Sequence, residues 1–392
     1  MKAPIGSLNP AVRSVHIWGG GVAGLLMGHF LSRQGFDIQL YEKSDRLGGK
    51  IQSHLLPEGV IEEGPNAIFA TAEIESWLQS LGLTVIPATP KLKRRLWNGT
   101  PLAPMSFGLA LKLLPKLFKR TPSVNDGITV AQFFRPLLGT HVESLLSPAL
   151  QGVYGCGADE LTIASVWPQL KAGRYWQVLR SLRSTKARSV SFKGGMTEFI
   201  QALAKSIKGQ IHLNYTGAFE LRPNTLICTE AHAASHLLNG SWAEGARLLE
   251  RLQYLSLSSV VALTPEIPET RGVFGYLFPR SSGVHALGVL FNREIFPQRA
   301  GVTFILPGTD DLETRVQSDL KMLSWPAGPL KTHTWAKALP RYNQTRTTTL
   351  KALQHDPERP FELVLFGNYV AGISLRDMIQ TASSFAGAHA PL

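Results

Sequence analysis

A short apolar strand that runs directly into spaced glycines is the feature that most constrains the fold of this chain. Residues 15–18 (Val-His-Ile-Trp) precede Gly19, Gly21 and Gly24, and residues 22–34 carry apolar side chains at helical spacing. The first glycine allows a tight turn, the second lets the main chain approach a pyrophosphate, and the third lets helix and strand pack closely. The pattern predicts a dinucleotide turn, because the free N–H groups and the dipole of a helix N-terminus favour an anion.

A second strand and an acidic residue complete this unit. Residues 38–41 (Ile-Gln-Leu-Tyr) form an apolar strand after Gly35, which is placed to end the helix in a left-handed conformation. Glu42 follows at the interval expected of the acid that binds a ribose hydroxyl. These features favour a bound dinucleotide over a glycine-rich turn without a ligand.

Composition bounds the class of protein. The 392 residues, 44% of them hydrophobic, suffice for about two to three domains. A net charge of +12 favours an anionic partner, but the basic residues are spread out without a recognisable nucleic-acid module, so we expect no nucleic acid to bind. Cys156 and Cys228 form neither a disulfide framework nor a metal half-site, and no stretch approaches the roughly 20 apolar residues of a membrane span. We expect a cytoplasmic protein and leave open a peripheral contact with the inner face of the membrane.

The chain changes character along its length. Residues 91–188 hold helical, basic segments separated by prolines, whereas residues 251–344 hold short strands divided by Pro, Gly and Ser. We therefore expect an α/β fold in which residues 1–90, 189–250 and 345–392 form a discontinuous Rossmann-like cofactor domain. Residues 91–188 are expected to form an inserted helical region that is a candidate for membrane contact, and residues 251–344 an α+β substrate domain with a β-sheet.

Further motifs resemble those of the protoporphyrinogen oxidases in the flavin amine oxidase superfamily. Residues 46–49 (Arg-Leu-Gly-Gly) resemble the R-x-G-G turn after the second strand, residues 62–67 (Glu-Glu-Gly-Pro-Asn-Ala) the E-x-G-P segment that passes the flavin ring, and residues 366–377 the C-terminal flavin motif. Shorter matches at residues 152–155, 192–196 and 274–279 extend the resemblance over nearly the whole chain. The resemblance implies FAD, a fold of the flavin amine oxidase type, and oxidation of protoporphyrinogen IX or coproporphyrinogen III in haem biosynthesis. Hydride would pass to the flavin, and oxygen is the expected electron acceptor.

The C-terminal match has independent physical support. Ser374 and Asp377 have the S-x-x-D spacing of a capping box, which predicts a helix start just after Gly372. A helix N-terminus aimed at a flavin would stabilise the negative charge that reduction adds there. Monoamine oxidases often attach their flavin through a cysteine near this segment, and neither cysteine of this chain lies there, so we expect non-covalent FAD.

One departure from the family concerns the adenine side of the cofactor. Only about ten residues, 215–224, stand where the family has a sheet of several strands, and a strand needs about five residues. Gly217 or Ala218 is the expected neighbour of the adenine, and Thr229 is followed by Glu230 where the family has proline. The full set of expected cofactor residues is Gly19, Gly20, Gly21, Val22, Ala23, Gly24, Glu42, Lys43, Arg46, Gly48, Gly49, Lys50, Gly64, Pro65, Asn66, Ala67, Gly217, Ala218, Thr229, Gly367, Asn368, Gly372, Ile373, Ser374 and Leu375.

For the substrate, the resemblance implies an apolar slot and one arginine. Arg94 is the expected partner of a propionate, because a guanidinium holds a carboxylate with two parallel hydrogen bonds. Residues 105–120 alternate apolar and basic side chains and suit either an anionic membrane surface or packing on the protein itself. We assign no catalytic residue and no metal ligand. The expected slot residues are Tyr276, Leu277, Leu287 and Val289.

Two alternatives stay open. The first alternative to a porphyrinogen oxidase is a related flavin enzyme that acts on an amine or a carotenoid. The second is an FAD- and porphyrin-binding protein that has lost turnover. The sequence leaves the oligomeric state open.

Overall fold

A five-stranded parallel sheet forms the centre of the predicted cofactor domain in the computed structural model, which describes residues 3–97, 101–102, 113–182 and 186–389. Its strand order is β10-β2-β1-β11-β17. The predicted strand, helix and strand at the N-terminus are confirmed, and Gly35 has the predicted left-handed backbone with a φ of +92°. The strands are β1 (Ser14–Trp18), β2 (Asp37–Tyr41), β10 (Gly209–His212), β11 (Thr225–Ile227) and β17 (Leu363–Leu365).

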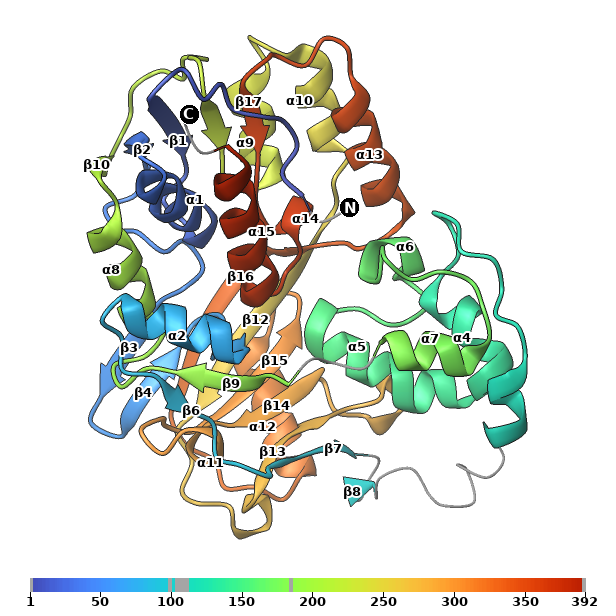
Figure 1. Cartoon of the computed structure of the whole chain (residues 1–392). Helices are drawn as coiled ribbons and strands as arrows, with labels where there is room; N and C mark the ends of the chain where they lie inside the picture. The colour runs from blue at the N-terminus through green and yellow to red at the C-terminus, as the bar shows by residue number, and fades with distance from the viewer. Residues whose placement is uncertain (1–2, 98–100, 103–112, 183–185, 390–392) are drawn as a thin grey trace.

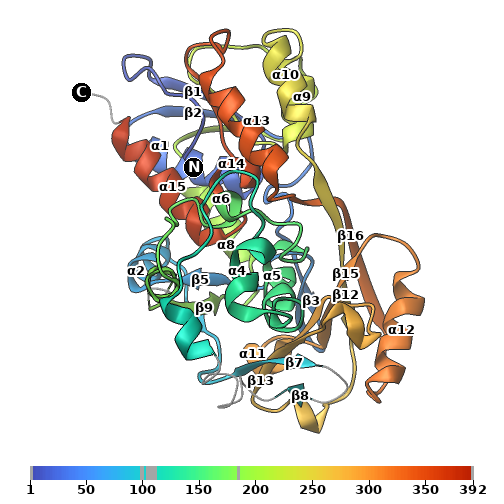
Figure 2. The ribbon, with the colours of Figure 1, turned by 90° about the vertical axis from the view of Figure 1, so that its right-hand side faces the viewer.

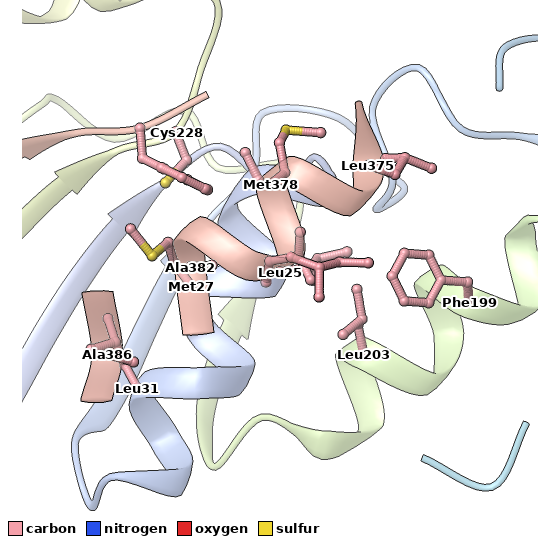
Figure 3. Close-up of a cluster of buried hydrophobic side chains, with 14 of the residues drawn as sticks. Leu25, Met27, Leu31, Phe199, Leu203, Cys228, Leu375, Met378, Ala382 and Ala386 are labelled. Carbon is pink, nitrogen blue, oxygen red and sulfur yellow. The ribbon is translucent and has the colours of Figure 1, made fainter. Parts of the chain in front are cut away.

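Helices cover both faces of this sheet (Figure 1). Successive side chains of a strand point to opposite faces, so Leu226 packs into one core and Ile227 into the other. Figure 3 shows side chains of α1, α8 and α15 meeting in the first core. The first face carries α1 (Val22–Arg33), α8 (Thr197–Ser206) and α15 (Leu375–Ala388), and the second α9 (Ala231–Leu238), α10 (Ala243–Glu250) and α13 (Gln344–His355).

A seven-stranded sheet with the order β16-β12-β15-β14-β13-β7-β8 forms the second body, below the five-stranded sheet in Figure 1. Helix α12 (Leu312–Met322) packs on one face of this sheet, and the short helix α11 (Asn292–Ile295) follows β14. The strands are β7 (Lys93–Trp97), β8 (Pro101–Leu102), β12 (Tyr254–Ala262), β13 (Val273–Leu277), β14 (Gly288–Phe291), β15 (Val302–Pro307) and β16 (Leu330–Pro340).

A helical region with its own core lies beside both sheets, as the turned view in Figure 2 also shows. The boundary predicted at residue 91 is corrected, because β7 pairs in parallel with β13 and so joins the seven-stranded sheet. Half of the predicted basic stretch 105–120, residues 105–112, lies outside the described residues. The helices are η1 (Leu114–Phe118), α4 (Val130–Leu138), η2 (Val142–Leu146), α5 (Ser147–Tyr154), α6 (Ile163–Val166) and α7 (Tyr175–Ser181).

Small elements join these bodies. A hairpin of β3 (Ser53–Leu56) and β4 (Gly59–Glu62) precedes a three-stranded sheet of β5 (Ile68–Ala70), β9 (Arg188–Ser191) and β6 (Ile86–Pro87), with α2 (Ala72–Ser80) after β5. Residues 213–224 contain no strand, which confirms that the connection from β10 to β11 is short. In the described part of the chain, no helix is both long enough and apolar enough to cross a membrane.

Candidate functional site

The glycine turn after β1 has the close packing that its sequence predicts. Gly19 has a φ of +107°, and a Cβ on Gly24 would lie 2.0 Å from the Gly19 carbonyl oxygen. Among the residues that the structure describes, no side chain caps α1, whose N-cap is Gly21 and whose first turn has no acidic residue. The first N–H groups of α1, at Val22 and Ala23, therefore face the carboxyl edge of the sheet without a side-chain cap, which suits a phosphate.

The R-x-G-G turn lies directly against the glycine turn. Gly48 N donates to Gly20 O at 2.9 Å, and a Cβ on Gly21 would meet only the Gly49 Cα, 4.0 Å away. Arg46 donates to Gly49 O at 3.0 Å and so braces its own turn. The two turns form a glycine-lined cradle that larger side chains would fill, so these residues fit a dinucleotide.

Glu42 holds the same cradle together. Its carboxylate accepts hydrogen bonds from Gly20 N at 2.7 Å and from Ser44 N at 2.9 Å, while the neighbouring Lys43 is exposed. Tyr215 N donates to Glu42 O, so the loop that carries the exposed Gly217 and Ala218 is fixed beside the acid. This position agrees with an adenine side in that loop, and the ribose contact of Glu42 stays a prediction.

Lys50 connects the cradle to two other parts of the chain. Its ammonium pairs with Glu230 and donates to Ala338 O at 2.9 Å, on β16. The lysine therefore joins the cradle to the loop after β11 and to the edge of the second sheet, and its role as a cofactor ligand stays a prediction. Thr229 does lie at the cradle, since a Cβ on Gly19 would be 3.0 Å from its methyl carbon.

A buried ion pair that sequence reasoning missed supports the E-x-G-P segment. Glu62 and Arg299 pair with side chains only 1% and 2% exposed. Arg299 also donates to Asn66 O at 3.2 Å, next to Gly64, Pro65 and Ala67. Burial raises the pKa of Glu62 against the opposing effect of Arg299, and burial lowers the pKa of Arg299. The 237 positions between the two residues explain why no local pattern revealed the pair.

The C-terminal motif forms a short helix, a glycine and a second helix start. After Gly367 come α14 (Asn368–Ala371), Gly372 with a φ of +112°, Ile373, and Ser374 as the N-cap of α15, which begins at Leu375. The predicted helix start is confirmed. The predicted capping bond is not formed, because the Ser374 side chain accepts no hydrogen bond at this N-cap.

The seven-stranded sheet separates the predicted slot residues onto two faces. Tyr276 pairs with Val289 and Leu277 with Gly288, and neighbouring residues of a strand point to opposite sides. Tyr276 and Val289 lie in the core shared with α12, where the Tyr276 ring is 6.1 Å from Trp325. Their prediction as substrate contacts is corrected, because their side chains fill this core.

Leu277 and Arg94 belong to the opposite face. A Cβ on Gly152 of α5 would lie 2.6 Å from the Leu277 side chain, so this face looks towards the helical region. Arg94 aligns with Gly275 of β13, is exposed, and lies 4.3 Å from the centre of the Phe274 ring. Within the described ranges Arg94 has no carboxylate partner at ion-pair distance, so its guanidinium is available to an anionic ligand. Leu287 is half-buried just before β14.

Comparisons with known proteins agree with these features. A family model described as an NAD(P)-binding Rossmann-like domain matches residues 17–81. Protoporphyrinogen oxidase 2 of Arabidopsis thaliana is 23% identical over 95% of this chain and 93% of the relative. Coproporphyrinogen III oxidase of Staphylococcus aureus is 28% identical, over 50% of this chain and 52% of that protein, so this alignment spans about half of each.

Solved structures share the fold over nearly the full chain. A protein from Exiguobacterium that is provisionally named a protoporphyrinogen oxidase has a TM-score of 0.76 at 18% identity, covering 96% of this chain and 98% of that one. Cyclohexylamine oxidase of Brevibacterium oxydans has a TM-score of 0.68 at 17% identity, covering 96% and 98%. The predicted α/β fold of the flavin amine oxidase type and the resemblance to porphyrinogen oxidases are confirmed.

Proposed function

We propose that this chain, which has the fold of the flavin amine oxidase superfamily and resembles porphyrinogen oxidases over nearly its full length, is an FAD-dependent oxidoreductase that converts a porphyrinogen to the porphyrin. The observation that carries the proposal is the glycine-lined cradle at the carboxyl edge of the parallel sheet, in a chain whose relatives are porphyrinogen oxidases. When bound non-covalently, FAD would supply the hydride acceptor. Oxygen is the proposed final acceptor.

The residues of the chain would divide the work of binding. The cradle of Gly19 to Gly24 with Gly48 and Gly49 would hold the diphosphate by N–H groups, since residues 19–24 contain no basic side chain. The segment 64–67, fixed through Asn66 by Arg299, and the start of α15 would hold the flavin end. The sheet face with Leu277 and Arg94 would orient the substrate, with the arginine on a propionate.

Anaerobic mixing tests this proposal. The purified protein, loaded with FAD, is mixed without oxygen with protoporphyrinogen IX or with coproporphyrinogen III, and the flavin absorbance is followed. We expect bleaching by at least one of them, and peroxide on readmission of oxygen. Bleaching by neither, with FAD bound, would leave a porphyrin-binding protein without turnover; bleaching by an amine instead would favour the amine oxidase alternative.

We also propose that the helical region contacts an anionic membrane surface. Exposed apolar side chains of η1 and α7 support this, namely Leu114 (50%), Phe118 (63%), Trp176 (39%) and Leu179 (39%). The two segments are tied together by Tyr175 N, which donates to Lys119 O at 3.2 Å. Exposed cations surround these side chains, and apolar area with cations suits anionic lipid headgroups. The cations are Lys119, Arg120, Arg174 and Arg180.

Vesicle sedimentation tests the membrane contact. We expect binding to phosphatidylglycerol vesicles that weakens with salt and is lost in the double variant Phe118→Glu, Trp176→Glu. Phe361→Glu is the matched control, because Phe361 is 79% exposed but lies in the cofactor domain. Equal loss in the control, or no binding by the unaltered protein, would reject the contact.

A further inference from the structure

Arg346 in the first turn of α13 and Tyr342 just before this helix hold three successive carbonyls of α14. Arg346, which is 4% exposed, donates from Nε to Tyr369 O at 2.8 Å and from Nη2 to Val370 O at 3.3 Å. Tyr342 donates its hydroxyl to Asn368 O at 2.7 Å. The first three carbonyls of α14 are therefore fixed from α13 and from the residues that join it to β16.

Arg346 also brings a charge into this buried place. Its guanidinium lies 4.1 Å from the centre of the Tyr342 ring, and tyrosines 154 and 254 are its other titratable neighbours. In the part of the chain that the structure describes, no carboxylate forms an ion pair with it. Burial lowers the pKa of Arg346, yet a guanidinium stays protonated in proteins. A buried cation without an anionic partner is costly, so its retention calls for a role.

The segment that Arg346 holds leads into the proposed flavin end of the site. α14 is followed by Gly372 and by Ser374, the N-cap of α15, whose side chain makes no capping bond. A fixed positive charge near this junction favours negative charge on a reduced ligand there. We propose that Arg346 is a positioning residue that orders residues 368–374 for FAD and makes the bound cofactor easier to reduce. This inference rests on the proposed function.

Three variants separate the two guanidinium hydrogen bonds of Arg346 from its positive charge. Arg346→Met removes both, Arg346→Lys keeps the charge but not the planar pair of donors, and Tyr342→Phe removes only the bond to Asn368. Arg359→Met is the matched control, because Arg359 donates to Gln354 O, a main-chain carbonyl of the same helix, without touching α14. For each protein, FAD affinity is measured by flavin fluorescence, the midpoint potential by anaerobic dye titration, and the stability of the apoprotein by thermal unfolding.

We expect Arg346→Met to weaken FAD binding about tenfold or more and to make the midpoint potential more negative. Arg346→Lys should weaken binding but keep the potential close to that of the unaltered protein, and Tyr342→Phe should weaken binding only. A merely structural role would lower thermal stability and leave the potential of the folded holoprotein unchanged. An unchanged midpoint potential in the folded Arg346→Met holoprotein overturns the inference, and so does an unchanged FAD affinity together with an unchanged potential. If Arg346→Met does not fold, the FAD affinities of Arg346→Lys and Tyr342→Phe decide, and unchanged affinity in both overturns the inference.

Failure of the proposed function gives a different pattern. If the unaltered protein binds no FAD, both the function and this inference fall. If it binds FAD and the variants behave as expected, but neither porphyrinogen bleaches the flavin, only the substrate is wrong.

Discussion

Replacing Arg299 by methionine should destabilise the protein more than almost any other single change. The substitution keeps an apolar stem of similar length and removes the guanidinium that pairs with Glu62 and bonds Asn66 O. Both partners are at most 2% exposed, so solvent cannot take the place of the lost charge. Breaking a buried ion pair from one side costs about 3–5 kcal/mol, because the remaining charge is left uncompensated.

The pH dependence of this cost has a definite sign. Burial already raises the pKa of Glu62 above its usual 4.5, and loss of the Arg299 charge would raise it further. A carboxyl whose folded pKa is above its unfolded value binds more protons in the folded state, so stability falls as pH rises from about 4.5 through the folded pKa. The deficit of Arg299→Met should therefore be smallest below pH 4.5 and largest near neutral pH.

The double variant Glu62→Gln, Arg299→Met provides the decisive comparison. Glutamine keeps an acceptor for Met196 N, which now donates to Glu62 at 2.8 Å, and removes the charge. Urea unfolding of the apoproteins at pH 5 and pH 8 should show that the double variant is more stable than Arg299→Met alone, a positive coupling. A loss below about 1 kcal/mol in Arg299→Met, or additive losses in the double variant, would refute the argument that the pair is a coupled buried unit.

Three further outcomes are expected. Burial lowers the pKa of His29 from 6.5 to about 4, so the unfolded chain takes up a proton at a higher pH than the folded protein. The free energy of unfolding should therefore fall by about 3 kcal/mol as the pH drops from 6.5 to 4. His29→Leu should remove this pH dependence in urea unfolding. Gly24→Ala should abolish FAD binding in a fluorescence titration, since its Cβ would lie 2.0 Å from the Gly19 oxygen, whereas Gly240→Ala, with nothing within 4 Å, should bind normally. Arg94→Ala should weaken porphyrinogen binding about tenfold in equilibrium titrations and leave FAD affinity unchanged; unchanged substrate affinity would remove Arg94 from the site.

The parts of this fold that the sequence predicted depend on near neighbours. The strand, glycine turn and helix at the N-terminus follow from the spacing of apolar side chains and from the backbone conformations that glycine permits. The start of α15 follows from Ser374. The missing capping bond shows the limit of such a rule, because spacing allows a bond without requiring it.

Features set by distant packing were not predictable in this way. Strand alternation shows that Tyr276 and Leu277 face opposite sides, but only the packing of α12 decides which side is core. The β7 strand joins the second sheet through β13, where Lys93 pairs with Val273, and Arg299 reaches Glu62 over 237 positions. Each of these contacts is invisible until the chain is folded.

The pair of Lys50 and Glu230 shows how a distant contact compensates for Glu230, which stands where the porphyrinogen oxidases that the chain resembles have proline. A carboxylate just after β11 would by itself repel the phosphates proposed for the nearby cradle. In the structure, Glu230 pairs with Lys50, the residue that follows Gly48 and Gly49, so the added negative charge is neutralised. Because Lys50 also donates to Ala338 O, the same ammonium ties the cradle to the seven-stranded sheet. The departure at Glu230 thus leaves the electrostatics of the proposed phosphate site intact and adds a fixed point between the two sheets.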